Sequence, residues 1–499
     1  MESQRSIAGE DHSGAGTIRT RRLLTRASSS EIVSNATLRF EGGVISSVAR
    51  DDASRDAYPD TMIIPALANA HDHGRGLKTI AYGAFDTAVE AWVPATYTLP
   101  KLDPYAVAAL AFARMACAGM TSIVHCHLSA DPPTLLAAAG AVSRAARDVG
   151  VRVGFVVPLR DRHRLGYGDD DAILAHMDTA DIEAIKARWL GPIAPIDSQL
   201  NAVEAIAERC SSPFFTVQYG PVGMEWCSDT LLAEVAKRAE ASQRRVHMHM
   251  LESRYQRAWA DRTYPEGPVA RLAKLGLLSP RLTLAHGTWL RPDESSVLAD
   301  HGVTVSVNTS SNLRLKSGIA QVQAMKAAKL KFAIGLDALA LDDDDDILRE
   351  LRLAHLLHAG LGFDHRVTRE DIFHAGSAIG ACAVCGDTGA GRIDAGTPAD
   401  FIVLNYKALS ADISRTLDDP FTTFFTRARR EHIAAVFAAG RPIVQDGRVL
   451  GIDQASLQRA LAQQVDEAAG DIAALQPLLK RFQEGLTRFY QASDHSSRS

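Results

Sequence analysis

Met62-Ile-Ile-Pro-Ala-Leu-Ala-Asn-Ala-His-Asp-His73 is an apolar, strand-like run that ends in two histidines. In an extended strand residues i and i+2 point to the same side, so the imidazoles of His71 and His73 converge on one point. Two neutral imidazoles are half of a site for a divalent metal such as zinc, which needs further ligands from elsewhere in the chain. A single His-x-His pair is a weak signal, and the rest of the sequence decides its meaning.

The same strand-like texture recurs along the chain. We identify eight apolar β-type runs, at residues 62–70, 121–127, 152–159, 213–220, 245–252, 282–288, 304–311 and 331–338. Between them lie Ala- and Leu-rich stretches that are typical of helices, at 103–118, 132–149, 228–242 and 347–360. Continuous apolar runs suit strands that are buried on both faces, and eight alternating β/α units predict an α/β fold, a closed (β/α)8 TIM barrel over residues 62–387.

Short alternating runs with glycine turns flank this barrel on both sides. Residues 17–61 and 388–451 have the short alternating apolar pattern that is typical of antiparallel strands, and we expect them to form one small β-sandwich domain. Residues 1–16 are polar and rich in Gly and Ser, which predicts a disordered tail. Residues 452–499 show helical spacing of Leu, Ala and Phe before a polar end, so we expect a C-terminal helical extension on the outside of the barrel or on a second subunit.

Polar side chains gather where the predicted barrel strands end, which is where barrel enzymes place their chemistry. In chain order they are His71, His73, His125, His127, Gln218, Tyr219, His247, His249, Glu252, His286, Asn308, Asn312 and Asp337. Histidines scattered at random would not favour the same end of successive strands. This alignment is the strongest functional signal in the sequence.

Composition excludes several classes of function. The 499 residues carry a net charge of -5, with 46% hydrophobic and 23% charged residues, so there is no basic surplus of the kind that nucleic-acid or membrane binding needs. Six cysteines in so long a chain are no disulfide framework and favour a reducing cytoplasm. We find neither an apolar stretch of membrane-spanning length nor the apolar core of a signal peptide.

Several motifs together resemble the metal-dependent amidohydrolase superfamily. They are His71-Asp-His73, His249-Met-Leu-Glu252, Ala285-His286-Gly287, Asn312-Leu-Arg-Leu-Lys-Ser-Gly-Ile-Ala, Gly335-Leu-Asp337 and Gly396-Thr-Pro-Ala-Asp-Phe-Ile-Val-Leu404. The resemblance covers roughly residues 17–450. Within the superfamily the chain is similar to the aminohydrolase branch that includes guanine deaminase, S-adenosylhomocysteine deaminase, formiminoglutamate deiminase and the triazine hydrolases.

The resemblance implies a metal site and a set of catalytic roles. It implies that one divalent ion, zinc first and iron as the alternative, is held by His71, His73, His249 and Asp337. It also implies that Glu252 shuttles protons and that His286 orients the attacking water or polarises the scissile bond, while Asp337 can accept the proton of the water. Three imidazoles and one carboxylate leave a position for water, whose pKa the ion lowers towards ~7.

The number of metal ions and of subunits follows from the same resemblance. Binuclear relatives use a carboxylated lysine at the end of the fourth strand, but that strand reads Phe214-Phe-Thr-Val-Gln-Tyr-Gly220 and has no lysine. We therefore expect one metal. Relatives often form dimers, which makes a homodimer the expectation here.

Residues beside the predicted metal site are candidates for contacts with a small-molecule substrate. His125 and His127 repeat the His-x-His geometry on the neighbouring strand; one of them lines the pocket or both belong to the core, and a second metal there is a minor alternative. The other candidates for the pocket wall are Gln218, Tyr219, Trp226 and Asn312.

Charged residues near the strand ends bear on the charge of the substrate. Arg75 follows the metal pair and Arg160 and Arg162 follow the third strand; arginine forks bind carboxylates, and the alternative is surface ion pairing. The aspartates 342–346 follow the eighth strand and are expected to cap the next helix. They also place negative charge near the mouth of the barrel.

Three further patterns have a structural interpretation. His247 shares the strand side of His249 and is expected to lie behind the metal ligands or to pack, because members of the family that the chain resembles place the ligand three residues before the glutamate, which selects His249. The pair His355 and His358 is expected on a helix without a functional role. Cys382 and Cys385 have no partner pair and fall where an Ala-rich helix is expected, so packing is the better interpretation.

These observations give one leading hypothesis for function. The chain is expected to be a hydrolase of C–N bonds other than peptide bonds, in which metal-bound hydroxide attacks an sp² carbon of a cyclic amidine or amino-heterocycle and releases ammonia or an amine. An alternative keeps this attack but opens the ring of a cyclic amide or displaces a sulfur or halide leaving group. A remote alternative is a non-catalytic scaffold that has kept the barrel. The presence of all the expected ligand and proton-shuttle residues argues against this alternative.

Overall fold

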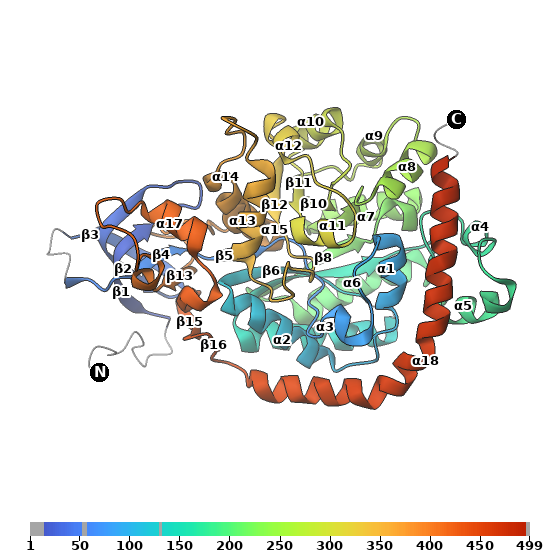
Figure 1. Cartoon of the computed structure of the whole chain (residues 1–499), viewed down its shortest axis with the longest axis horizontal. Coiled ribbons are helices and arrows are strands. Elements are labelled where there is room, and N and C mark those ends of the chain that lie inside the picture. The colour runs from blue at the N-terminus through green and yellow to red at the C-terminus, as the bar shows by residue number, and fades with distance from the viewer. Residues whose placement is uncertain (1–13, 52–56, 129–131, 496–499) are drawn as a thin grey trace.

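Two eight-stranded sheets organise the described residues, 14–51, 57–128 and 132–495, of this computed structural model (Figure 1). The strands of one sheet come from both flanks of the chain, and those of the other come from its middle. The predicted disordered tail falls mostly on residues 1–13, outside the described residues, and the first strand begins at Gly16.

The first sheet joins the two flanks. Its strands are β1 (Gly16–Leu24), β2 (Ile32–Glu41), β3 (Val44–Arg50), β4 (Met62–Pro65), β13 (Phe401–Leu404), β14 (Ile433–Ala438), β15 (Arg441–Gln445) and β16 (Arg448–Val449). They lie in the order β16-β15-β14-β13-β4-β1-β2-β3, so β4 pairs with β13 on one side and β1 on the other. Phe40, Phe401 and Phe437 stack in its core, with the rings of the last two 4.6 Å apart. The predicted β-sandwich of the two flanks is confirmed.

The second sheet is the barrel. Its strands are β5 (Leu67–Asn69), β6 (Met120–Cys126), β7 (Arg152–Leu159), β8 (Phe215–Pro221), β9 (Val246–Met250), β10 (Leu282–His286), β11 (Thr304–Val307) and β12 (Lys331–Ile334). Neighbours in space are neighbours in sequence and pair in parallel. The backbone N–H of Ala70 donates to the carbonyl oxygen of Ile334 at 2.9 Å and closes β5 onto β12. The predicted (β/α)8 barrel is confirmed.

One predicted strand is in fact two. The run 62–70 divides at Ala66: β4 belongs to the sandwich and only β5 belongs to the barrel. The N–H of Ala66 donates to the carbonyl oxygen of Asp400 in the sandwich, whereas that of Leu67 donates to the carbonyl oxygen of Gly119 beside the barrel. Both strands are fully buried, so the apolar pattern continues without a break across the domain junction and conceals it.

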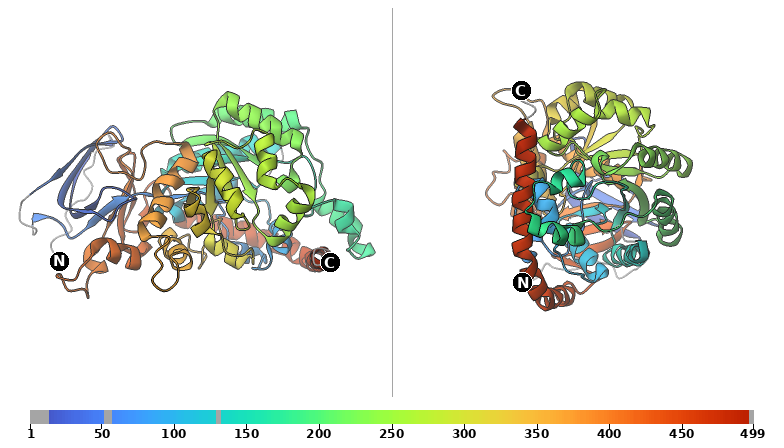
Figure 2. Two further views of the ribbon diagram at one scale, coloured as in Figure 1. Left: turned by 90° about the horizontal axis from the view of Figure 1, so that it is seen from above. Right: turned by 90° about the vertical axis from the view of Figure 1, so that its right-hand side faces the viewer.

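Helices cover the outside of the barrel (Figures 1 and 2). They are α1 (Val89–Thr96), α2 (Pro104–Cys117), α3 (Pro132–Val149), α4 (Asp170–Leu174), α5 (Ile182–Trp189), α6 (Ile196–Cys210), α7 (Asp229–Ser242), α8 (Arg254–Thr263), α9 (Pro268–Lys274), α10 (Pro292–Asp300), α11 (Thr309–Arg314), α12 (Val322–Ala327), α13 (Ile347–His358), α14 (Arg369–His374) and α18 (Gln454–His495). Three helices lie elsewhere: α15 (Gly380–Cys385) packs on β5, β6, β7 and β12 in the barrel interior, and α16 (Tyr406–Leu409) and α17 (Pro420–Arg427) lie beside the first sheet. The side chains of Asp103 and Ser228 cap α2 and α7 by accepting from backbone N–H groups of the first turn.

The aspartate run before α13 has two roles. Asp346 accepts from the N–H of Leu348, as expected of a helix cap. Asp345 is instead buried, and its carboxylate contacts Lys78 Nζ at 2.5 Å and Arg114 Nε at 2.8 Å. Arg114 also donates to the carbonyl oxygens of Arg75 and Gly76, so this ion pair fixes the loop that follows the first barrel strand.

The last helix, α18, is the longest and crosses the outside of the molecule (Figure 1). It runs along the bottom of the view beside α2, turns a corner, and continues up the right-hand side next to α1. Pro477 lies inside it and cannot donate to the carbonyl of Ala473, which accounts for the change of direction. No helix in the described part of the chain combines the length and the apolar character needed to cross a membrane.

Candidate active site

The site lies at the carboxyl ends of the barrel strands. His71 and His73 follow β5, His249 lies on β9, and Asp337 follows β12. Four positions here have left-handed backbone although they are not glycine: Leu251 (φ 50°), His286 (φ 75°), Asp337 (φ 54°) and Ala338 (φ 56°). L-residues adopt this conformation only when their surroundings impose it, and such strain concentrates at functional sites.

The side chain of Asp72, between His71 and His73, stabilises the loop that carries both histidines. Asp72 is buried, and its carboxylate accepts from the N–H of Gly74 at 2.7 Å and from the N–H of Ala338 at 2.9 Å. Asn69 Nδ2 donates to the same carboxylate at 2.8 Å. Because Ala338 follows Asp337, this network ties the loop of the two histidines to the loop of the carboxylate. Sequence reasoning missed Asp72 and Asn69, since only tertiary pairing gives them a role.

The four predicted ligands converge. Asp337 Oδ1 lies 3.2 Å from the Nε2 atoms of both His71 and His73. The candidate ligand atoms of His71, His73 and His249 all lie within 4.8 Å of one another. These four side chains are therefore brought to one point, as the sequence predicts.

Hydrogen bonds behind the imidazoles set their tautomers. Nδ1 of His73 lies 3.1 Å from the carbonyl oxygen of Cys126, and Nδ1 of His249 lies 2.9 Å from that of Val222. A carbonyl oxygen only accepts, so each Nδ1 carries the proton and each Nε2 presents a lone pair to the site. Partners of this kind orient the ligands of metal sites.

His71 is held from behind by a fourth histidine. Its Nδ1 lies 2.8 Å from Nε2 of His247, which stands behind the ligands as predicted. Burial lowers the pKa of His71 to about 4, so its ring is neutral at pH 7.

The ligand atoms meet the requirements of a cation. Nε2 of His71 is buried, and among the described residues no partner satisfies it with good hydrogen-bond geometry. Lone pairs of His71 and His73 therefore face a carboxylate oxygen of Asp337 at 3.2 Å, an arrangement that is repulsive without a positive charge between the atoms. Three imidazole nitrogens and one carboxylate suit zinc or iron.

The two predicted proton-handling residues lie next to the ligands. Glu252 Oε2 is 3.7 Å from His286 Nε2, and Glu252 Oε1 accepts from Ser317 Oγ at 3.2 Å. Burial raises the pKa of Glu252. Ser311 Oγ donates to the second oxygen of Asp337 at 2.6 Å and leaves the first oxygen facing the histidines.

The structure places Asn312 behind the site, not in contact with the cavity. Its Oδ1 lies 3.0 Å from Nδ1 of His286, which Asn308 Nδ2 also approaches to 3.3 Å, and these contacts hold the ring with Nε2 towards Glu252. The side chain is buried and does not line the cavity described below. The predicted substrate contact is thus corrected to a role that acts through His286.

Gln218 and Tyr219 are also placed away from the cavity. Gln218 Nε2 donates to the carbonyl oxygens of Ala383 and Val384 on α15, deep in the barrel interior. The hydroxyl of Tyr219 bonds to Glu204 on α6, outside the barrel. Successive residues of a strand point to opposite faces, and at this strand neither side chain reaches the mouth. The cavity is met here by Gly220, Pro221 and Val222 instead.

The second His-x-His pair is divided between the wall and the core. His127 lines the cavity. His125 is buried between the rings of Phe112 and Phe155, at 5.7 and 5.6 Å. Burial lowers the pKa values of both histidines, that of His127 to about 4. Neither belongs to a group of converging metal-ligand atoms among the described residues.

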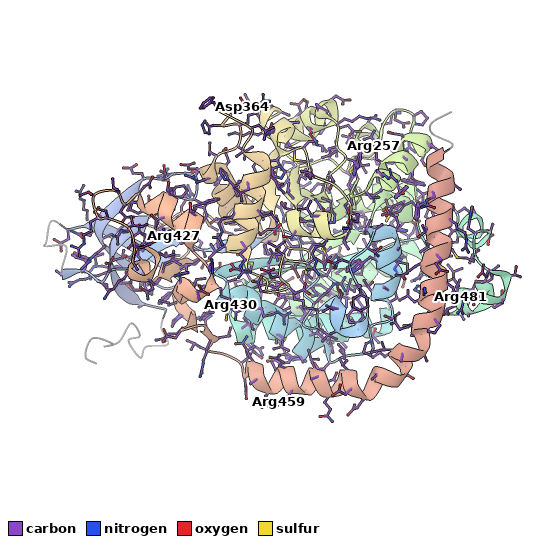
Figure 3. The ribbon with its side chains drawn as sticks, in the orientation of Figure 1. Arg257, Asp364, Arg427, Arg430, Arg459 and Arg481 are labelled. Atoms are coloured by element: carbon purple, nitrogen blue, oxygen red, sulfur yellow. The ribbon has the colours of Figure 1, made fainter. Side chains whose placement is uncertain are left out.

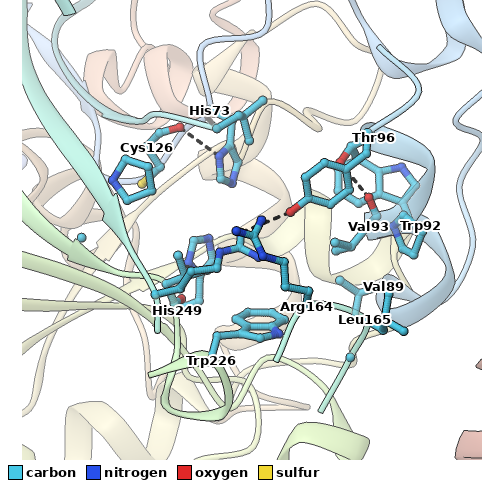
Figure 4. Close-up of a pocket in the computed structure, with 18 of the residues that line it drawn as sticks. His73, Val89, Trp92, Val93, Thr96, Cys126, Arg164, Leu165, Trp226 and His249 are labelled. Carbon is cyan, nitrogen blue, oxygen red and sulfur yellow. Dashed lines mark hydrogen bonds between the residues drawn. The ribbon is translucent and has the colours of Figure 1, made fainter. Parts of the chain in front are cut away.

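A cavity of about 730 Å³ opens beside the ligands (Figure 4). Figure 4 shows His73 and His249 on one side of it and Trp92, Val89 and Leu165 on the other. Its volume is within the range of pockets that bind small organic molecules. Apolar and aromatic side chains make up much of the wall, and the polar ones include the ligand histidines, Glu252 and three arginines.

Three arginines line this cavity, of which the sequence predicted two. Arg75 is buried with its guanidinium 5.2 Å from the ring centroid of Trp92, and its Nε and Nη1 have no hydrogen-bond partner among the described residues. Arg160 donates to the hydroxyl of Tyr97 at 3.2 Å. Arg164 also lines the cavity, whereas Arg162 donates to Tyr264 and Met224 and points elsewhere.

Several cavity residues carry no signal in the sequence. Glu90 of α1 accepts from Ser253 Oγ, and burial raises the pKa of Glu90 to about 7. Tyr97 follows α1, and the neighbouring Arg160 guanidinium lowers its pKa. Phe482 and Tyr490 come from α18. Trp226, which the sequence did predict for the pocket, lines the cavity.

Comparison with known proteins places this site in a family. A family model described as the amidohydrolase family matches residues 62–443. A curated 5-methylthioadenosine/S-adenosylhomocysteine deaminase of Bacillus cereus is 30% identical over 291 residues, which are 57% of this chain and 66% of that protein. The match thus spans slightly less than two thirds of that relative.

Solved structures share the fold. An adenosine deaminase from Xanthomonas campestris with bound zinc superposes with a TM-score of 0.75 at 21% identity and covers 91% of this chain and 98% of that one. An atrazine chlorohydrolase from Arthrobacter aurescens TC1 complexed with zinc has a TM-score of 0.73 at 20% identity, with 90% and 99% covered. At these low sequence identities, the structural similarity shows that the fold is shared.

Proposed function

The chain belongs to the amidohydrolase family, and from that premise we propose that it hydrolyses a C–N bond at an sp² carbon of an amino-heterocycle or cyclic amidine and releases ammonia or an amine. The observation that carries the proposal is the convergence of His71, His73, His249 and Asp337 beside the pair Glu252 and His286. Curated relatives named as deaminases support the choice of leaving group.

A single divalent metal is the proposed cofactor, with zinc first and iron as the alternative. His71, His73, His249 and Asp337 would hold it, and their lone pairs already face one another as such an ion requires. When bound, the ion supplies Lewis-acid chemistry and lowers the pKa of water towards ~7, which makes a nucleophile available at neutral pH.

The remaining steps belong to protein groups. Oδ1 of Asp337 faces the ligand nitrogens and is placed to accept a proton from water, while Ser311 holds its other oxygen. Glu252 has a raised pKa, so it can hold a proton and deliver it to the leaving nitrogen. His286 presents Nε2 between Glu252 and the ligands, where it can stabilise charge that develops on the substrate.

The cavity suggests the shape and charge of the substrate. Trp92, Trp226 and Tyr167 offer flat apolar surfaces for a ring and an apolar substituent. Buried guanidinium N–H groups of Arg75 without a partner among the described residues, together with Arg160, favour an anionic group on that substituent. An aminopurine that carries a long substituent ending in a carboxylate combines these properties.

The test is ammonia release by metal-reconstituted protein. The panel holds adenine, adenosine, 5-methylthioadenosine and S-adenosylhomocysteine, with guanine, aminopyrimidines, aminotriazines and formimino compounds beside them. Asp337→Asn is the blank, and Glu252→Gln tests proton delivery with the ligand set intact. Ammonia from one panel member, absent in the blank, supports the proposal; silence from fully metallated protein contradicts a deaminase and favours ring opening or a sulfur or halide leaving group.

Homodimer formation and a cytoplasmic location remain predictions. Sedimentation equilibrium of the full chain and fractionation of the source cells would test them separately.

A further inference from the structure

Part of the cavity wall comes from a segment outside the family-matched residues 62–443. Phe482 and Tyr490 both belong to α18 and both line the cavity. Each is buried, and they are two turns apart along the same face of the helix. The part of α18 after Pro477, residues 478–490, is here termed the C-terminal strap.

The C-terminal strap is fastened to the cavity wall by aromatic contacts. The ring of Phe482 lies 4.8 Å from that of Trp189 at the end of α5, and Trp189 Nε1 donates to the carbonyl oxygen of Pro94 in α1. The ring of Tyr490 lies 5.6 Å from that of Tyr167 and 5.1 Å from that of Tyr255.

Polar contacts fix the strap to the same segments. Arg481 forms a two-pronged ion pair with Asp181, with N···O distances of 2.7 and 2.9 Å (Figure 3). Gln483 Nε2 donates at 2.8 Å to the carbonyl oxygen of Ala91 in α1. The hydroxyl of Tyr490 accepts from the N–H of Tyr167 at 3.0 Å.

Close backbone approach shows that the strap fits tightly. A side chain at Gly166 would collide with the Tyr490 hydroxyl, and one at Gly485 would collide with Met177. The strap therefore holds α1 and residues 165–190 in one arrangement, and both of these segments line the cavity.

We propose that the C-terminal strap is the specificity-determining wall of this enzyme, and that Phe482 and Tyr490 fix the length and shape of the substituent that the substrate ring carries. The inference rests on the proposed function for the identity of the ring. The ligand end of the cavity is set by barrel strands, whereas the strap packs on α1 and residues 165–190, whose Val89, Trp92 and Leu165 lie across the cavity from His73 and His249 (Figure 4). The strap thus acts on the substituent and not on the reacting carbon.

The experiment compares substrates that share a ring and differ in substituent: adenine, adenosine, 5-methylthioadenosine and S-adenosylhomocysteine. The variant is Phe482→Ala in the full chain, loaded with metal. The matched control is Leu461→Ala, which truncates an equally buried residue of the same helix that packs on Ala106 and Leu110 of α2, away from the cavity.

The expected result is a change in selectivity. Phe482→Ala should lower kcat/KM for the longest accepted substrate by about 10-fold or more relative to the shortest one, mainly through KM, since a lost apolar contact in a pocket has effects of this size. Leu461→Ala should leave the ratio unchanged. An equal fall for all substrates, or an unchanged ratio, would overturn the proposal; if Phe482→Ala does not fold, Phe482→Leu takes its place.

A second measurement separates this inference from the proposed function. If the wild-type enzyme turns over no panel member, the proposed function has failed, and the wall is tested with the apolar anion 8-anilino-1-naphthalenesulfonate as the probe. Its fluorescence-detected affinity should fall at least about 5-fold in Phe482→Ala and in Arg160→Ala but not in Leu461→Ala, by the same loss of contacts. No binding to wild-type protein, or equal binding to all four proteins, would overturn the inference.

Discussion

At the scale of single residues, the side chains of Asn312 and Asn308 hold the imidazole of His286. Asn312 Oδ1 makes the shorter contact with Nδ1, at 3.0 Å against 3.3 Å for Asn308 Nδ2, and helps to keep Nε2 directed at Glu252. Asn312→Ala should lower kcat by roughly 10- to 100-fold, as loss of an orienting partner commonly does, with little change in KM. Steady-state kinetics measures this, and Asn312→Asp, which keeps an acceptor, should recover most of the activity. A rise in KM alone would contradict the placement of Asn312 behind His286.

Tyr219 offers the opposite case, because its phenol lies outside the barrel against Glu204. Tyr219→Phe should leave kcat and KM within about 2-fold and lower the free energy of unfolding by about 1 kcal/mol, the usual net value of one hydrogen bond. Urea denaturation and kinetics on the same preparation measure both. A large rise in KM would instead indicate that Tyr219 contacts the substrate.

The sequence predicted the position of residues well where several strands repeat the same strand-end pattern. It predicted the position of isolated side chains poorly. His71, His73, His249 and Asp337 converge as predicted because strand periodicity aims all of them at the barrel mouth. The same periodicity does not tell how deep a residue lies in the barrel, which is why Gln218 was predicted in the pocket. Its amide meets the carbonyls of α15 instead.

At the scale of elements, the aspartates before α13 differ although they are adjacent. Asp345 is buried against Lys78 and Arg114, whereas Asp342 is exposed. Asp345→Asn should lower the free energy of unfolding by about 3–5 kcal/mol because it leaves two cations without their partner. Asp342→Asn, the matched control, should change it by less than about 0.5 kcal/mol. Equal effects in calorimetry would contradict this division of the run.

Helix α13 also carries a pH-dependent contact. Glu350 holds the N–H and hydroxyl of Ser310, and burial raises the pKa of Glu350 from 4.5 to about 7. The protonated carboxyl is therefore favoured in the folded state, so its stabilising contribution is complete below pH 4.5 and is lost as the pH rises to about 7. Glu350→Gln removes this titration while keeping a donor and an acceptor.

The stability difference between wild type and Glu350→Gln should accordingly change between pH 5 and pH 8, by up to about 3 kcal/mol in favour of the variant at high pH. Urea midpoints of both proteins over this range measure it, and other pH-dependent groups cancel in the difference. If the two proteins differ in stability by the same amount at every pH, Glu350 has the same pKa in the folded and unfolded chains, which contradicts this prediction.

Elements were predictable from the sequence where local pattern and fold agree. The helices at 103–118 and 228–242 match α2 and α7 because Asp103 and Ser228 provide caps at their starts. The run 62–70 was predicted as one strand because β4 and β5 are both buried and no turn residue separates them. Only the pairing of β4 with β13, far along the chain, reveals the division.

At the scale of the whole molecule, stability should depend on the metal. Ligands from β5, β9 and the loop after β12 meet at one point, and an ion that binds only the folded chain stabilises it by mass action. With free zinc at 100 times its Kd the gain is about 2.7 kcal/mol. Chelation should therefore lower the melting temperature and zinc should restore it, while Asp337→Asn should respond less. A melting temperature that is indifferent to chelation would contradict a metal at these residues.

The whole-molecule arrangement of the cavity lay beyond sequence reasoning. Barrel strands could be counted from periodicity, but the cavity wall also uses α1, residues 165–190 and α18, which meet only after folding. The C-terminal helix itself was predicted, with its packing on the barrel as one of two alternatives. Its contacts with Trp189, Tyr167 and Asp181 have no counterpart in local pattern, because the partners are far apart in sequence; Arg481 and Asp181 are separated by 300 positions.

The junction of β4 and β5, where the two domains meet, has a consequence for folding during synthesis. On the ribosome, β4 and β5 emerge early, but the strand that flanks β4 begins at Phe401 and the strand that closes on β5 ends at Ile334. A nascent chain that stops short of Phe401 therefore exposes an apolar, unpaired strand edge a few residues before His71 and His73, the predicted metal ligands. We expect translation intermediates of this protein to need chaperone protection until β13 has been synthesised, and to acquire metal only after that point.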